Sequence, residues 1–289
     1  MVVILSLLIA CRGTPEPVGA KAPVAEAPPA APRLVPGTAI LARPEPVGAP
    51  IAYEAVDVEG GSFAMGSLPS EPGRDDDERN HVVTLSRGFR LGKIEVTQAL
   101  WDQVMELNPS RVKDPALPVD RVAWIDAIAF ANALSARDGL APAYTVSGTD
   151  VAWNVEANGW RLPTEAEWEF AARGSATAVH DFAGSDDVDA VAWTQTNAKG
   201  SSHPPCQKAA NLLGICDMSG NVREWTWDRY APYAGSPETD PSGPTGGQQR
   251  TLRGGAYSDT FTQARVANRN RGLPGVRFVV NGLRLARNR

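Results

Sequence analysis

Residues 161–169 read Arg-Leu-Pro-Thr-Glu-Ala-Glu-Trp-Glu, and they contain the strongest structural signal in the chain. Thr164 followed by Glu167 forms a capping box, in which the threonine hydroxyl accepts from the glutamate amide and the glutamate carboxylate reaches back. From Trp168 onward, apolar side chains recur at the i, i+3 and i+4 spacing of a helix face. The sequence therefore predicts a helix that starts after Thr164, buries Trp168 and ends at Gly174.

Apolar spacing places two more helices upstream. Thr97 can cap a helix that extends to Glu106 and buries Leu100 and Val104. A second helix, stopped near Gly139, follows from four residues at the i, i+3, i+4 and i+7 positions: Ala127, Phe130, Ala131 and Leu134. Elsewhere, 27 glycines and 24 prolines indicate many turns, short strands and long loops. These features predict a loop-rich α+β domain with a few helices.

Composition excludes several classes of function. The formal net charge of −5 offers no concentrated basic surface, so we expect no nucleic-acid partner. Three cysteines and three histidines are too few for a disulfide scaffold or a four-cysteine zinc site. The usual motifs of metallohydrolases, nucleotide-binding proteins and dinucleotide-binding proteins are absent, because HExxH, GxxxxGK(S/T) and strand-linked GxGxxG do not occur. The acidic run at residues 75–78 is interpreted as a solvated loop.

The first eleven residues are similar to an export signal with a lipidation site. Residues 2–10 form an apolar run too short to span a bilayer, which needs about 20 residues, but suited to a signal peptide. The run ends Leu8-Ile9-Ala10-Cys11, like a bacterial lipobox, although no Lys or Arg precedes it. We predict a lipoprotein signal peptide over residues 1–11 and a lipid-anchored Cys11. The alternative is a buried cysteine behind a misassigned start.

The predicted lipid anchor implies a location in the bacterial cell envelope, as a periplasmic or outer-membrane lipoprotein. Residues 12–50 are rich in proline and alanine, and such a segment cannot bury enough apolar surface to offset its ordering entropy. Proline also stiffens a chain toward extended polyproline II. We therefore predict a disordered spacer over residues 12–50 and one globular domain over residues 51–289.

The helix-forming string is one of several distinctive strings between residues 55 and 287. A second long string, Asp217–Trp225, reads Asp-Met-Ser-Gly-Asn-Val-Arg-Glu-Trp. Shorter strings are GGSFAMG at 60–66, EVT at 95–97, RGG at 253–255 and GLR at 282–284. Their order resembles the formylglycine-generating enzyme, or sulfatase-modifying factor, family. This resemblance implies the family's C-type-lectin-like α+β fold.

The resemblance also locates the family's catalytic loop. Enzymes of the family oxidise a sulfatase cysteine to formylglycine, using oxygen and a copper(I) ion held by two cysteines. Here Ala256 stands at the family's serine position and Asp259 at the first cysteine position, and no cysteine follows Cys216. Soft thiolates suit copper(I), whereas a carboxylate is a hard oxygen donor. We therefore expect no copper, and no residue of this loop is assigned as catalytic.

Other metal and cysteine chemistry is also limited. A branch of the resembling family holds non-heme iron with three histidines, but His81, His180 and His203 are scattered, with none at helical spacing. We interpret them as surface or hydrogen-bonded histidines. Cys206 and Cys216 do not stand at the copper positions. In an exported protein they form an even pair, which we interpret as a structural disulfide; the alternative is two separate thiols.

The resemblance further implies a structural calcium site within the second long string. The corresponding ligands are two acids and two main-chain carbonyls, a set that calcium accepts: Asp217, Gly220, Val222 and Glu224. The alternative is a turn held by hydrogen bonds, with Glu224 solvated. A second family calcium site would use Asn197 and the Ala198 carbonyl, but its partner aspartate has no clear counterpart.

Two functions follow from these observations. The first is a non-catalytic binding or accessory module that binds an envelope protein, a peptide or a glycan. It is favoured because the cysteine pair is missing while the scaffold strings are present. The alternative is a divergent oxidoreductase with a different constellation, for which four polar residues lie nearest the ancestral cleft: Tyr257, Asp259, Arg265 and Arg269.

Overall fold

The computed structural model describes residues 37–174 and 180–289, so the predicted lipidation site at Cys11 lies outside the described residues. The helices are α1 (Gln98–Val104), α2 (Trp124–Arg137), α3 (Glu165–Arg173), α4 (Val188–Val191) and the 3-10 helix η1 (Phe261–Ala264). The strands are β1 (Ala55–Val58), β2 (Gly61–Met65), β3 (His81–Leu85), β4 (Phe89–Gly92), β5 (Tyr144–Ser147), β6 (Asp150–Trp153), β7 (Arg223–Arg229), β8 (Glu238–Thr239), β9 (Arg250–Arg253), β10 (Asn270–Gly272), β11 (Asn281–Gly282) and β12 (Ala286–Asn288).

The three helices predicted from apolar spacing and caps are confirmed. At α3, the Thr164 hydroxyl accepts from the Glu167 amide at 3.1 Å, and the Glu167 carboxylate accepts from the Thr164 amide at 2.8 Å. Gly174 ends this helix in the left-handed conformation, with φ of 75°. The Thr97 side chain caps α1 as expected, although the helix ends at Val104, two residues early.

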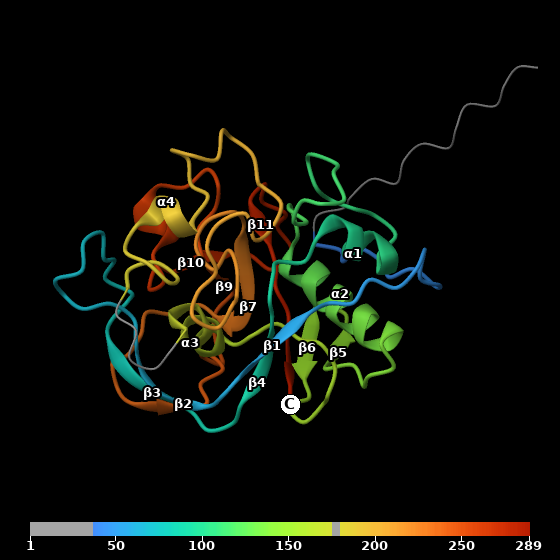
Figure 1. Ribbon diagram of the computed structural model, residues 1–289. Coiled ribbons are helices and arrows are strands. Elements are labelled where there is room, and N and C mark those ends of the chain that lie inside the picture. Colours follow the sequence, from blue (N-terminus) through green and yellow to red (C-terminus); the bar gives the residue numbers. More distant parts are fainter. Residues whose placement is uncertain (1–36, 175–179) are drawn as a thin grey trace, which may run out of the picture. The chain divides into compact units, whose positions relative to one another are not determined.

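The strands form four small sheets, and most pairings join segments that are distant in the sequence (Figure 1). Three strands pair in the order β1-β4-β12, and another three in the order β2-β3-β8. The largest sheet has the order β10-β9-β7-β11, while β5 and β6 form a hairpin. These short strands, connected by long loops, confirm the predicted loop-rich α+β class.

Two apolar clusters form most of the core. One surrounds α1 and α2, where Trp101 stacks on Phe130 with ring centroids 4.9 Å apart. The other packs α3 against the β2-β3 hairpin and β4, with Trp168 fully buried at its centre. Tryptophan is therefore used mainly to fill the interior, as its number in the sequence suggests.

The folded unit begins earlier than composition predicts. Ile40 is 3% exposed, and its amide donates to the buried Asp126 carboxylate at 2.8 Å. Arg43 donates its amide to the Val104 carbonyl, so the segment runs along the end of α1. Residues 37–50 therefore belong to the domain, and the predicted boundary at residue 50 is too late. Polar backbone groups of this proline-rich segment find partners on the helices, which its composition does not indicate.

A buried ion pair connects β7 to the end of β4 and to the loop at Cys216. The Arg284 guanidinium donates to both oxygens of Glu224 at 2.8 Å, and neither side chain is more than 1% exposed. The same group donates to the carbonyls of Gly92 and Cys216. Breaking such a pair leaves a buried charge without compensation, which is costly.

We predict that Arg284→Met lowers the free energy of unfolding by about 3–5 kcal/mol, because Glu224 would remain buried and unpaired. Urea unfolding followed by tryptophan fluorescence measures this loss. Arg90→Met is the matched control, since Arg90 pairs with Asp57 where both side chains are more than 40% exposed; it should cost at most about 1 kcal/mol. Similar losses for both variants would contradict the assignment of Arg284 as a central contact.

Candidate functional site

The loop after β9 carries the positions at which the resemblance places catalytic groups. Ala256 is fully buried in a small apolar cluster with Tyr257 and Val280. Both oxygens of Asp259 accept from the Arg223 guanidinium of β7, at 2.9 and 2.8 Å, and Asp259 is 7% exposed. The first cysteine position of the resembling enzymes is therefore occupied by a structural ion pair.

The polar residues expected near the ancestral cleft have separate partners. Arg265 donates to Glu78 at 2.7 and 3.0 Å, while Arg269 donates to Glu165 at the start of α3, at 2.7 and 2.8 Å. Tyr257 is buried among apolar side chains. These groups belong to different contacts and do not assemble one reaction centre with Asp259.

The three histidines also lie apart. His81 packs on Tyr233 with ring centroids 4.8 Å apart, and His203 stacks on Trp193 at 3.8 Å. His180 lies at the surface, where its Nδ1 is 3.1 Å from the Asp186 carboxylate. Each histidine thus has its own aromatic or acidic neighbour, which agrees with their interpretation as individually bonded side chains.

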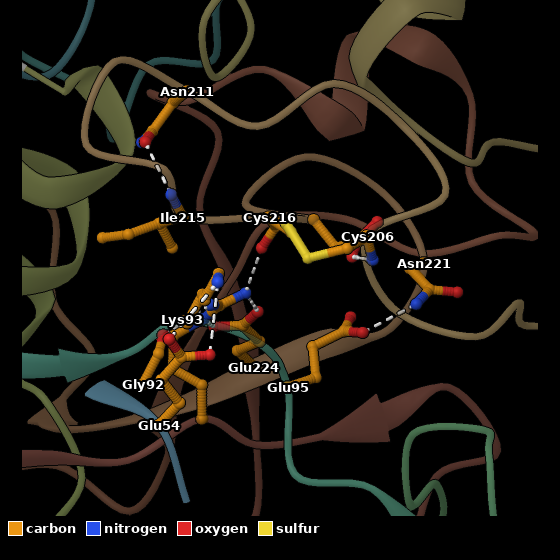
Figure 2. The surroundings of a disulfide bond; sticks show 12 residues. Glu54, Gly92, Lys93, Glu95, Cys206, Asn211, Ile215, Cys216, Asn221 and Glu224 are labelled. Atoms are coloured by element: carbon orange, nitrogen blue, oxygen red, sulfur yellow. Dashed lines mark hydrogen bonds and ion pairs between the residues drawn. A yellow bond between two sulfur atoms is a disulfide. The ribbon is translucent and has the colours of Figure 1, made fainter. Parts of the chain in front are cut away.

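The structure contains the predicted disulfide between Cys206 and Cys216 (Figure 2). The Cys206 amide donates to the Asp217 carboxylate at 2.7 Å, so the cross-link directly positions this acid. Cys206 and Asp217 both have positive φ angles, 62° and 56°, which L residues rarely adopt. The disulfide and this hydrogen bond together hold the strained loop.

Three buried carboxylates lie beside the disulfide, and one of them, Glu95, is not among the ligands predicted from the sequence. Glu95, Asp217 and Glu224 are 0%, 3% and 0% exposed. Burial, followed by the Asp217 charge, raises the pKa of Glu95 well above its usual value. Burial also raises the pKa of Asp217 to about 6, although the Cys206 amide and Arg284 oppose this shift. Arg284 is the cation paired with this group, so the carboxylates outnumber it.

Glu95 holds the turn that carries the predicted calcium ligands. Its carboxylate accepts from the Asn221 side chain at 2.6 Å (Figure 2). It also accepts from the Val222 amide at 3.1 Å. Gly220 is required in this turn, because its φ is 79° and a Cβ atom would lie 2.3 Å from the Trp193 carbonyl oxygen. The signal available in the sequence was the position of Glu95 in the EVT string, immediately before the capping Thr97.

The turn could accept a cation. Asp217 Oδ1 is buried and receives no hydrogen bond from the described part of the chain. Glu224 accepts from Trp168 Nε1 at 2.7 Å as well as from Arg284, so the alternative of a solvated Glu224 is wrong. A buried oxygen without a donor and an excess of carboxylates are the features that a hard cation satisfies. Within the predicted set, Asp217 therefore fits a metal ion best, because both oxygens of Glu224 already accept hydrogen bonds.

The second family site fits less well. The Asn197 side-chain oxygen accepts from the Thr194 amide, and its nitrogen donates to Asp189 and Ala192. The Ala198 carbonyl lies 3.0 Å from His203 Nε2 and accepts from the Ser201 amide. Both groups are engaged within the protein.

The acidic run at residues 75–78 is only partly solvated. Glu78 is 0% exposed and binds Arg265 and the Ser67 hydroxyl. The Asp77 carboxylate accepts from Tyr230. The interpretation of the whole run as a solvated loop is wrong for Glu78, because its partner Arg265 lies 187 residues further along the chain.

Comparison with known proteins agrees with this arrangement. Residues 42–289 match the family model of the sulfatase-modifying factor enzyme 1-like domain. The chain belongs to this family. It is 36% identical to the chaperone protein LppX of Paenibacillus barcinonensis over 266 residues, which is 81% of this chain and 86% of LppX. It is 30% identical to the formylglycine-generating enzyme of Streptomyces coelicolor over 286 residues, covering 83% and 91% of the two chains.

A solved structure gives the same fold. Treponema denticola variable protein 1 superimposes with a TM-score of 0.75 and 30% identity, over 81% of this chain and 95% of that protein. The sulfatase-modifying factor fold predicted from the sequence strings is thereby confirmed. Among the described residues, none of the helices has the length and apolarity needed to cross a membrane.

Proposed function

We propose that this sulfatase-modifying factor-like domain is a non-catalytic accessory module of the bacterial cell envelope, which binds exposed apolar segments of another protein. The observation that carries the proposal is the loop between β10 and β11. Four of its apolar side chains are 39–54% exposed: Leu273, Val276, Phe278 and Val279. Apolar side chains that gather in one exposed loop commonly mark a protein-binding surface.

The backbone of this loop is held in place although its side chains are exposed. Gly37 and Ile125 donate their amides to the Gly275 and Pro274 carbonyls, at 3.2 and 3.1 Å. Arg277 pairs with Asp126, which is completely buried at the start of α2. A loop fixed in this way loses little conformational entropy when it binds, which favours affinity.

The similarity to a protein named as a chaperone supports the same class of function. The ion pair of Asp259 with Arg223 also supports it, because the position of the first copper-binding cysteine is occupied by a carboxylate that is already bound. A divergent oxidoreductase is the alternative, and it would need a reaction centre that these residues do not form.

We predict that the full chain delays aggregation of reduced insulin, a model client with exposed apolar segments, in a light-scattering assay. In the double variant Val276→Asp with Phe278→Asp, the protein concentration needed for the same delay should rise at least about tenfold. The reason is that each apolar side chain contributes about 1.5–3 kcal/mol when buried. Leu68→Asp with Leu212→Asp is the matched control, because these side chains are 60% and 74% exposed elsewhere. Equal loss in both double variants would remove the loop as the binding surface, and no protection by the wild type would reject the proposed function.

The alternative is tested by assaying formylglycine production. We expect no conversion of a sulfatase-type cysteine peptide by the purified chain supplied with copper and oxygen, because a carboxylate is the wrong donor for copper(I). Asp259→Cys should not restore activity, since the second thiolate would still be missing. Metal-dependent conversion by the wild-type chain, seen by mass spectrometry, would instead establish the enzyme.

We also propose that calcium binds the turn at residues 217–224, with Asp217 and Glu224 as acidic ligands and the Gly220 and Val222 carbonyls completing the set. Support comes from the unbonded Asp217 Oδ1 and the surplus of buried carboxylates. Glu95 positions the turn through Asn221 and Val222.

If calcium binds there, a concentration about 100-fold above its dissociation constant should stabilise the protein by about 2.7 kcal/mol. Melting temperatures measured with calcium and with chelator test this directly. Asp217→Asn should abolish the difference, whereas Asp75→Asn, in the other acidic group at residues 75–78, should leave it intact. Identical melting of the wild type in both conditions, after removal of bound metal, would favour a turn held by hydrogen bonds alone.

The envelope location rests on the lipobox-like ending at Cys11. We propose that this cysteine is lipidated and tethers the domain to a membrane. Cys11→Ser should then move the protein from the membrane fraction to a soluble or unprocessed pool, and metabolic labelling with a fatty acid should mark only the wild type. Membrane association that is unchanged in the variant, together with an unlabelled wild type, would contradict lipid anchoring.

A further inference from the structure

A cavity of about 260 Å³ lies between the start of α3, the end of β7 and the loop that follows β7. Met65 and three prolines supply apolar walls. Its polar lining includes His81, Glu165, Asp228 and Arg269. None of these residues belongs to the calcium turn or to the exposed loop between β10 and β11.

Most charged groups of the cavity are already satisfied. Arg269 binds both oxygens of Glu165, and it also donates to the carbonyls of Asp77 and Ala231, at 3.0 and 2.8 Å. Arg253 adds a second cation to Glu165 at 3.1 Å. The floor of the cavity is therefore a rigid, internally bonded network.

Two buried side chains keep an unused acceptor. Asp228 is 3% exposed; its Oδ2 accepts from the Glu165 amide at 2.7 Å, while Oδ1 has no bond to any described residue. His81 is 6% exposed, and its Nδ1 lies 2.9 Å from the Arg79 carbonyl. Because a carbonyl only accepts, Nδ1 carries a proton, and Nε2 is the acceptor of the neutral ring. This nitrogen likewise has no partner within the described chain, and both residues line the cavity.

The charge of the lining favours a cation. Three acids and two arginines line the cavity, and only Glu165 of these acids is paired with arginines, whereas Asp228 and Glu238 form no ion pair with a described residue. Burial, followed by the charge of Glu165, raises the pKa of Asp228 well above its usual value. A cationic group beside Asp228 would favour the charged form of its carboxylate and so oppose this shift.

We propose that this cavity binds the cationic end of an alkylamine or alkylguanidine, such as a lysine or arginine side chain of a partner or a free amine. Ammonium and guanidinium groups only donate hydrogen bonds, and so match the free acceptors of His81 and Asp228. The methylene stem would pack against Met65 and the proline rings, as long cationic side chains do on apolar surfaces. The site is separate from the loop proposed for client binding, so either can fail without the other.

The test is a titration of the full chain with n-butylammonium, N-acetyl-lysine amide and N-acetyl-arginine amide, with N-acetyl-norleucine amide as the uncharged control. The chain has three histidines, whose ring protons can be followed by NMR. We expect the cations to shift the His81 signals and to leave those of His180 and His203 unchanged, while the norleucine derivative shifts none. Binding of the amino acid amides indicates a partner's side chain as the source, and binding of butylammonium alone indicates a free amine.

Asp228→Asn supplies the second measurement. It keeps the acceptor for the Glu165 amide but removes the charge, and should weaken binding by about tenfold to a hundredfold. Glu156→Gln is the matched control, because this exposed acid lies outside the cavity and pairs with Arg87. If Asp228→Asn fails to fold, the wild-type histidine titration still decides. An unmoved His81, or an equal response to the norleucine derivative, overturns the proposal.

Discussion

The pairing of Arg284 with Glu224 is the contact on which the rest of the structure depends. One guanidinium binds the carboxylate of β7, the Gly92 carbonyl at the end of β4 and the Cys216 carbonyl of the disulfide loop. Trp168 of α3 donates to the same carboxylate. Because neither charge can be hydrated at this depth, these four segments can be arranged in few ways that satisfy both. In this fold the strands are short, and side-chain ion pairs make connections that longer sheets make through backbone hydrogen bonds.

Buried ion pairs between arginine and carboxylate side chains also anchor α3, which is only nine residues long. Glu165 and Glu169 on this helix are held by Arg253 of β9, and Arg269 and Arg173 add further pairs. Residues from the C-terminal third thus fix a helix whose start is specified locally by its capping box. The pair of Arg223 with Asp259 extends the pattern to the loop where related enzymes carry chemistry. This ion pair connects β7 to the loop that follows β9.

Local signals explain what the sequence could predict. The three helices depend on caps and apolar spacing within a few residues, and the disulfide joins cysteines only 10 positions apart. The burial of Glu78 and Glu95 could not be predicted, because their partners Arg265 and Asn221 lie 187 and 126 residues away. An acidic residue is predicted to be solvated unless its distant hydrogen-bond or ion-pair partner is known. The same limit applies to residues 37–50, whose composition suggests a linker although Ile40 contributes to the core.

The buried acids of α3 and those beside the disulfide differ in how many arginines neutralise them. Around α3, Glu165 and Glu169 meet three arginines, so these two acids are fully paired. Beside the disulfide, Glu95, Asp217 and Glu224 share Arg284, and one oxygen of Asp217 is left without a donor. Burial and the nearby carboxylates raise the pKa values of both Glu95 and Asp217. A cation bound beside Asp217 would compensate this buried negative charge, whereas Glu165 and Glu169 are already paired with arginines.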